Sequence, residues 1–333
     1  MRAKIVGALL IVYVVWGSTY LAIAVADRTL PPLLMLATRF ALAGGLLYAW
    51  SAWRGDVRTA RPGRREWAAA AVVGGLLLFV DTGGIAWAEQ RVASGLTALL
   101  VAAVPLFTAL LDRTFFGIRL SLGALAGIAT GLLGVALLVG QSAHVDPVGA
   151  TVIIGAAFAW AAGSAYARVA PLPGAPFLSA AMQMLCAAAF LAVAGASMGE
   201  VGRVHPATIS AGSLAAFGFL VVFGSIVAFT AYGWLLRSGA SSVLVSTYAY
   251  VNPAVAVLLG WLFVGETVGG RELAAGAVIL ASVGMLVVSR VPHGHEESPL
   301  LPETVGPYLR RKEAQERPIQ QVPRLGDLPR MAP

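Results

Sequence analysis

Residues 241–264, SSVLVSTYAYVNPAVAVLLGWLFV, hold no charged side chain and are numerous enough to cross a bilayer as one helix. The centre of this segment carries Asn252 and Pro253. Because Pro253 has no N–H, the carbonyl group of Ala249 loses its helical donor. In hydrocarbon, a free carbonyl is tolerated only where protein or a wet cavity satisfies it. The segment therefore predicts a broken membrane helix beside a cavity.

A related segment precedes it at 93–111, ASGLTALLVAAVPLFTALL, in which Pro105 corresponds to Pro253. Broken helices at matching positions in two halves of a chain are typical of transporters with internal repeats. We therefore predict Pro105 and Pro253 to be hinges.

The composition places the chain in the membrane. Of its 333 residues, 58% are hydrophobic and 12% are charged, whereas soluble domains average about 25% charged residues. The single cysteine excludes a disulfide framework and a cysteine-rich metal site. The net charge of +7 comes from arginines in loops and in the tail, which indicates membrane orientation rather than nucleic-acid binding.

Apolar runs predict an all-α polytopic membrane protein with ten transmembrane helices. They lie near 5–26, 30–53, 67–88, 92–111, 120–140, 147–167, 175–198, 213–236, 240–264 and 273–289. The two halves, 1–140 and 147–289, hold five spans each. Because five is an odd number, the second half enters the membrane from the opposite side, and two similar halves then form an inverted repeat. Helices rich in Ala, Gly and Leu also resemble one another without duplication, which is the alternative explanation. Residues 290–333 are rich in Pro, Arg, Glu and Gln, and we expect a disordered tail.

The loop at 54–65 carries five arginines and is therefore predicted to be cytoplasmic. Threading ten spans from that loop places both termini in the cytoplasm. The chain is therefore predicted to cross its membrane many times.

Polar and aromatic side chains near the middle of several spans predict a central cavity. Aromatic residues facing lipid normally lie at the interfaces instead. The candidates come from the first, sixth and ninth spans, where each group shares one helical face: Trp16, Thr19, Tyr20, Trp160, Ser164, Tyr248 and Asn252. The alternative is that these rings fill gaps between helices and the hydroxyls bond neighbouring backbones.

Arg39 and Asp81 lie well inside the second and third spans, at similar depth. A charge at the bilayer centre costs at least ~2.5–3.5 kcal/mol, so we expect either a buried ion pair or two groups facing one wet cavity. Asp81 is the deep titratable group available for proton coupling, and a structural ion pair is the alternative. Glu89 lies at the outer end of its span, where it is solvated by default or else contacts a substrate amine or forms a gate.

Small residues predict that the fifth and tenth spans pack closely, against each other or against a partner subunit, through Gly127, Gly131, Gly134 and Gly276. The chain has no Walker-type phosphate loop, no HExxH motif and no Ser–His–Asp arrangement within the spans. We therefore expect no enzyme, no metal and no cofactor.

The motifs WGSTY (16–20), RF (39–40), AEQ…ASGLTALL (88–100), VPLF (104–107), STYAYVNPAVAVLLG (246–260) and GE (265–266) occur together. In this combination the chain resembles the EamA-type transporters of the drug/metabolite transporter superfamily, in particular their YedA-like bacterial inner-membrane members, over residues 5–289. The resemblance implies two inverted five-helix repeats around a cavity lined mainly by helices 1, 3, 4, 6, 8 and 9. The family pattern covers Trp16, Glu89, Pro105, Tyr248, Asn252 and Pro253. Asp81 departs from it, since a neutral polar residue occupies that position in the pattern.

The resemblance implies a secondary exporter of amino acids, related metabolites or amphiphilic compounds that works by alternating access. Its expected partners are a small-molecule substrate, the bilayer and protons as a candidate coupling ion, in a monomer or homodimer and without nucleic acid. The alternatives are a membrane-embedded sensor or scaffold with a vestigial cavity, and a passive channel. One fold in this superfamily serves many chemistries, so the substrate does not transfer from the resemblance.

Overall fold

The computed structural model describes residues 2–92, 97, 100–118, 120–139, 146–259, 262 and 269–288. The predicted tail at 290–333 lies outside these residues. Within them the chain forms helices and turns and no strand, in agreement with the all-α prediction.

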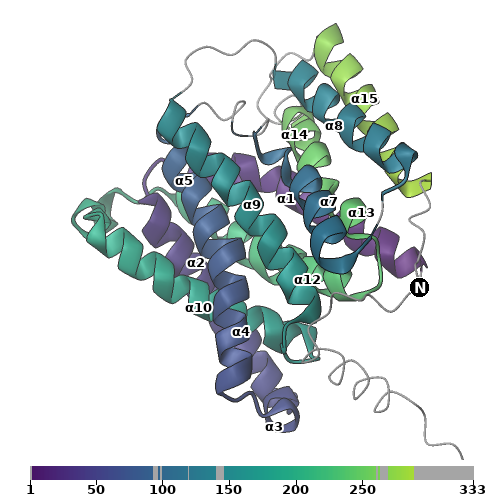
Figure 1. Ribbon diagram of the computed structural model, residues 1–333. Coiled ribbons are helices and arrows are strands. Elements are labelled where there is room, and N and C mark those ends of the chain that lie inside the picture. Colours follow the sequence, from purple (N-terminus) through teal and green to yellow (C-terminus); the bar gives the residue numbers. More distant parts are fainter. Residues whose placement is uncertain are drawn as a thin grey trace, which may run out of the picture.

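The helices of the first half run from α1 to α8 (Figure 1). They are α1 (Arg2–Ala26), α2 (Pro32–Trp53), α3 (Asp56–Ala60), α4 (Arg64–Gly74), the π-helix η1 (Gly75–Gly83), α5 (Gly84–Ala88), α7 (Val104–Phe116) and α8 (Leu122–Val139). The second half holds α9 (Pro147–Val169), α10 (Pro176–Ser197), the short 3₁₀ helices η2 (Glu200–Arg203) and η3 (Pro206–Thr208), α11 (Ala211–Phe219), the π-helix η4 (Leu220–Phe229), α12 (Thr230–Arg237), α13 (Ser242–Ser246), α14 (Tyr248–Leu259) and α15 (Gly270–Val288).

Among the described residues, seven helices are long and apolar enough to cross a membrane. They are Ala3–Ile23, Pro32–Trp53, Arg64–Ala88, Pro147–Val169, Pro176–Ser197, Ala211–Arg237 and Ser242–Leu259. Two shorter apolar helices, Leu122–Leu137 and Leu273–Val288, accompany them. The structure is therefore that of a multi-pass membrane protein.

Two of the long helices contain a π-helical stretch in their middle. The stretch η1 joins α4 to α5, and η4 joins α11 to α12. In a π-helix each N–H bonds to a carbonyl five residues earlier, and such turns occur frequently at functional sites. The hydrophobic pattern predicts the two spans but not their π-helical stretches. The pattern indicates which residues are apolar, whereas a π-helix differs from an α-helix in which carbonyl each N–H bonds to.

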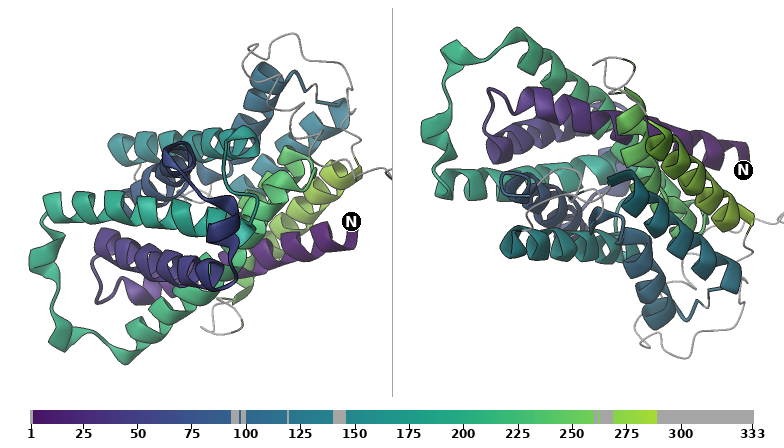
Figure 2. Two further views of the ribbon diagram at one scale, coloured as in Figure 1. Left: turned by 90° about the horizontal axis from the view of Figure 1, so that it is seen from below. Right: turned by 90° about the horizontal axis from the view of Figure 1, so that it is seen from above.

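Helices α8 and α15 pack side by side at one edge of the molecule (Figures 1 and 2). A Cβ at Gly127 would lie 2.8 Å from Cγ of Leu286, and one at Gly134 would lie 2.8 Å from Cγ1 of Ile279. The hydroxyl of Ser282 donates to the carbonyl of Gly127 over 2.7 Å. The predicted close packing of these helices is confirmed for these glycines.

The prediction that Gly276 packs against the fifth span is wrong, whereas its packing against a partner subunit stays a prediction. A Cβ there would meet no atom within 4 Å among the described residues, so this glycine lies outside the helix contact.

The segment at 241–264 is broken, but not at its proline. Helix α13 ends at Ser246 and α14 begins at Tyr248, whereas Pro253 lies inside α14. The carbonyl of Thr247 accepts from the amides of both Tyr250 and Val251, over 2.9 and 3.2 Å. Pro105 lies in the first turn of α7, where a proline removes no helical hydrogen bond. The two segments therefore break just before their proline-bearing helices.

Candidate substrate cavity

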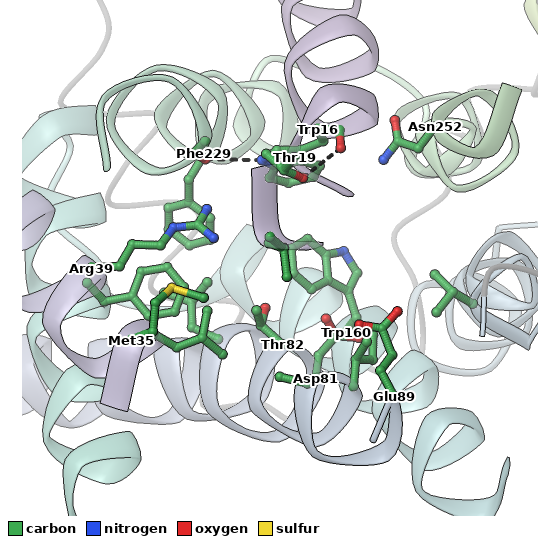
Figure 3. Close-up of a pocket in the computed structure, with 18 of the residues that line it drawn as sticks. Trp16, Thr19, Met35, Arg39, Asp81, Thr82, Glu89, Trp160, Phe229 and Asn252 are labelled. Atoms are coloured by element: carbon green, nitrogen blue, oxygen red, sulfur yellow. Dashed lines mark hydrogen bonds between the residues drawn. The ribbon is translucent and has the colours of Figure 1, made fainter. Parts of the chain in front are cut away.

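A cavity of about 380 Å³ lies between the helices near the middle of the molecule. Its walls come from α1, α2, η1, α5, α9, η4 and α14, together with residues just before and at the start of α7 (Figure 3). Helix α2 is an addition to the set of lining helices that the family resemblance implies, since it contributes Met35, Leu36, Arg39 and Phe40.

Most of the predicted site residues line this cavity: Trp16, Thr19, Arg39, Asp81, Glu89, Trp160, Tyr248 and Asn252. Ser164 does not, because it lines a separate small pocket together with Asp112 and Arg168. Pro105 and Pro253 do not line it either. The side chain of Tyr20 lies outside the described part of the structure.

Four rings close one end of the cavity, and we call Trp16, Trp160, Tyr232 and Tyr248 the aromatic floor. All six pairs of these rings have centroids 5.0–6.0 Å apart, the range of favourable aromatic contact. The indole N–H of Trp160 donates to the hydroxyl of Tyr232 over 2.8 Å. That hydroxyl also shares a 2.7 Å hydrogen bond with the hydroxyl of Ser164. The floor is therefore held both by edge-to-face and tilted ring contacts and by hydrogen bonds.

The π-helix η4 anchors the wall beside the floor. Indole Nε1 of Trp16 donates to the carbonyl oxygen of Gly224 over 3.2 Å. On the same turn, Ser225 accepts a 2.8 Å hydrogen bond from Nε of Arg39, whose side chain is 5% exposed. The guanidinium also lies 5.1 Å from the ring centre of Phe40. These contacts fix Arg39 on the side of the cavity formed by α2 and η4.

Asp81 occupies the other π-helix, η1, and is 6% exposed. It forms no hydrogen bond and no ion pair within the described residues. Arg39 and Asp81 therefore form no ion pair with each other, and the alternative of a buried ion pair is wrong for this structure. Instead both groups line the same cavity, the second arrangement expected from their depth; Figure 3 shows Arg39 on one side and Asp81 with Glu89 towards the other.

Asn252 presents a second unsatisfied group. Its side chain is 4% exposed, and its Oδ1 atom has no hydrogen-bond partner within the described residues. Because buried polar atoms normally find partners, the amide is a candidate for contact with a ligand in the cavity.

Two carboxylates, Asp27 and Glu89, line the cavity just beyond the ends of α1 and α5, about three helical turns from Trp16 along α1. We call this end of the cavity the mouth. Asp27 is exposed to solvent. Burial raises the pKa of Glu89 to about 7, and the charge of Asp27 adds to this rise. Although the residue as a whole is exposed, partial desolvation of its carboxyl group and the charge of Glu200 raise the pKa of Asp27 to about 6. Glu200 accepts from the amides of Leu33 and Leu34, over 3.3 and 2.8 Å, and so caps α2.

Beyond the floor, contacts between helices close the other end of the molecule. Arg168 of α9 forms an ion pair with Asp112 of α7, which is 3% exposed. Tyr13 of α1 shares a hydrogen bond with Thr247, at the break between α13 and α14. Arg237 donates to the carbonyl of Pro173 over 2.9 Å.

The structure adds lining or supporting residues that sequence reasoning missed: Asp27, Thr82, Gly224, Ser225 and Tyr232. A signal for the last two was present, because Ser225, Phe229 and Tyr232 are spaced i, i+4 and i+7 in one apolar run, which places them on one helical face. Asp27 gave no such signal, because a carboxylate after an apolar run is usually solvated. Within the described residues no group of three potential ligands could hold a metal ion.

The fold and the cavity define a multi-pass membrane protein with a solute-sized pocket between its helices. Models of the EamA-like transporter family match residues 3–140 and 147–288. The chain belongs to this family and is a membrane transporter.

Relatives with curated descriptions are also named as transporters, efflux pumps or exporters. The chain is 41% identical over 280 residues to the inner membrane transporter YedA of Escherichia coli K12, covering 83% of this chain and 89% of YedA. It is 27% identical to a probable amino-acid metabolite efflux pump of Salmonella typhimurium, over 82% of this chain and 91% of the pump. It is also 27% identical to a probable terminal-alkyne amino-acid exporter of Streptantibioticus cattleyicolor, over 86% of this chain and 94% of the exporter.

A protein of known crystal structure superposes with a TM-score of 0.71 at 21% identity, covering 86% of this chain and 96% of the other. At that identity the likeness concerns the fold alone.

Proposed function

We propose that the protein is a secondary active exporter of small metabolites such as amino acids or amphiphilic compounds across the cytoplasmic membrane. The observation that carries the proposal is a cavity with unsatisfied polar groups inside an apolar helix assembly. The cavity reaches solvent-exposed Asp27 at its mouth and is closed at its other end by the aromatic floor. The names of two relatives, an amino-acid metabolite efflux pump and an amino-acid exporter, support the substrate class.

The proposed architecture is ten transmembrane helices in two inverted five-helix repeats, 1–140 and 147–289. Two features support it. The family model matches twice, at 3–140 and 147–288, and the third long apolar helix of each half carries a π-helical stretch, η1 and η4.

Alternating access would rock these repeats around the cavity. The contacts beyond the floor, Arg168 with Asp112 and Tyr13 with Thr247, must then break when the other end opens. The turns that precede the proline-bearing helices α7 and α14 are the proposed points of bending, because the helical hydrogen bonds are interrupted there.

In the predicted topology both termini are cytoplasmic, so the mouth faces outwards and the structure corresponds to the outward-open state of the proposed cycle. Asp81 is the proposed site of proton coupling, since a buried carboxyl group without a protein partner can exchange a proton for another cation. The active unit is a monomer or a homodimer.

Counterflow in proteoliposomes tests the proposal. Vesicles preloaded with unlabelled amino acid should transiently accumulate the labelled form, because a carrier exchanges one for the other. The flux should saturate with concentration and should survive removal of residues 290–333.

The alternatives give other outcomes. A passive channel predicts flux that rises linearly and shows no counterflow. A sensor or scaffold predicts no flux at all and a cellular function that disappears with the tail.

A further inference from the structure

The charged groups that line the cavity are unequal in number: three carboxylates, Asp27, Asp81 and Glu89, face one guanidinium, Arg39. Arg39 already has a protein partner, since its Nε bonds to Ser225. Asp81 has none within the described residues. A ligand that enters this cavity therefore meets more acidic groups than basic ones.

The hydrogen-bonding groups show the same imbalance. The Asp81 carboxylate is 6% exposed and the Asn252 Oδ1 atom is buried, and neither accepts a hydrogen bond within the described residues. Burying an ionised carboxylate without a partner is costly. An ammonium group supplies the missing charge and up to three N–H donors.

The aromatic rings of the cavity also favour a ligand with an ammonium group. Trp16, Trp160 and Tyr248 line the cavity as well as forming its floor. The faces of such rings attract cations, and the rings themselves accommodate an apolar body.

We propose that the ammonium group, rather than the carboxylate, is the feature by which this cavity selects its substrate. The ligand class is primary amines with an apolar or aromatic body, including amino acids whose carboxylate is accessory. The ammonium group binds at Asp81, and the body lies against the aromatic floor. Arg39 meets the carboxylate of an amino acid but is not needed for an amine. This inference rests on the proposed function, which it narrows to one chemical group.

Three ligands that differ by one group test it on the native full-length protein. They are phenylalanine, 2-phenylethylamine, which lacks the carboxylate, and 3-phenylpropanoate, which lacks the ammonium group. Titration calorimetry of the detergent-purified protein at pH 8 keeps the carboxylates of the mouth ionised. The amine and the amino acid should bind saturably, and the propanoate should bind about thirtyfold more weakly or worse.

Variants then locate the ammonium group. Asp81→Asn should weaken binding of both amine-bearing ligands by about thirtyfold or more, whereas Arg39→Gln should weaken phenylalanine binding more than 2-phenylethylamine binding. The matched control is Asp146→Asn, the same substitution at the N-cap of α9 away from the cavity, where asparagine also caps well. The control should bind all ligands as the native protein does.

Each contrary outcome has a distinct meaning. Equal binding of all three ligands, or amine binding that survives Asp81→Asn, overturns the inference and leaves the exporter proposal standing. Absence of saturable binding by all three ligands overturns the inference and also the amino-acid part of the proposed function. Because the ligand series uses the native protein, the test stands even if a variant fails to fold.

Discussion

Indole Nε1 of Trp16 donates a hydrogen bond to the carbonyl oxygen of Gly224, joining α1 to the π-helix η4 across 3.2 Å. The next residue of that turn, Ser225, holds Arg39. A single irregular turn thus positions a ring of the aromatic floor and the guanidinium of the cavity wall.

Trp16→Phe should keep the ring contact and leave the carbonyl of Gly224 without its donor. We expect a loss of about 1–3 kcal/mol of stability, the cost of an unsatisfied buried polar group, measured as a lower melting temperature in detergent. Trp50→Phe is the matched control, because Trp50 is 46% exposed on α2. Equal melting temperatures for the two variants would contradict the role of the hydrogen bond.

Gly224→Ala tests the space that the guanidinium occupies. A Cβ there would lie 2.7 Å from Nη2 of Arg39 and 3.2 Å from Cγ2 of Thr19, so the cation must move. We expect counterflow of phenylalanine to fall about tenfold or more, since small displacements at a binding site are costly.

Gly218→Ala is its control on the same long helix, because no atom lies within 4 Å of the added Cβ. This change should leave transport intact and slightly favour the helix. Similar losses in both variants would show that the effect belongs to the helix and not to Arg39.

Arg168 and Asp112 should be energetically coupled, because their ion pair is buried on the Asp112 side. Each single change to alanine leaves an unpaired charge, and the double change removes both. We expect a coupling energy of about 0.5–3 kcal/mol in a double-mutant cycle of unfolding free energies. Additive losses would mean that the pair does not hold α7 to α9.

The pH dependence of stability should report on Glu89. Its pKa is raised to about 7, so between about pH 4.5 and 7 the folded protein binds more protons at this site than the unfolded chain does. Stability should therefore fall as the pH rises through this window. Glu89→Gln should flatten that slope in melting temperatures recorded from pH 5 to 8. Part of the slope should remain, because the pKa of Asp27 is raised as well; an unchanged slope would contradict the assignment.

The apolar runs and the positions of Trp16 and Asn252 were sufficient to predict a helical membrane protein with a central cavity, because hydropathy and depth are properties of the sequence. The widening of η1 and η4 was not predictable in this way. Leu, Val and Phe are compatible with both the α-helical and the π-helical hydrogen-bond pattern. Tertiary contacts, such as that of Ser225 with Arg39, are what favour one pattern over the other. Likewise Pro253 indicated a break, but the break lies at Thr247, where the hydroxyl of Tyr13 and two backbone amides meet.

The most direct measurement of the central claim is ligand protection of a single cysteine in the cavity. Ala86 lines the cavity on α5, so Ala86→Cys in a Cys186→Ser background places a thiol there. Ala211→Cys provides an exposed control at the start of α11. We expect a membrane-impermeant thiol reagent to label both from the side of the mouth, and phenylalanine to slow labelling at 86 alone. Labelling at 86 that is absent, or that phenylalanine does not change, would contradict the account.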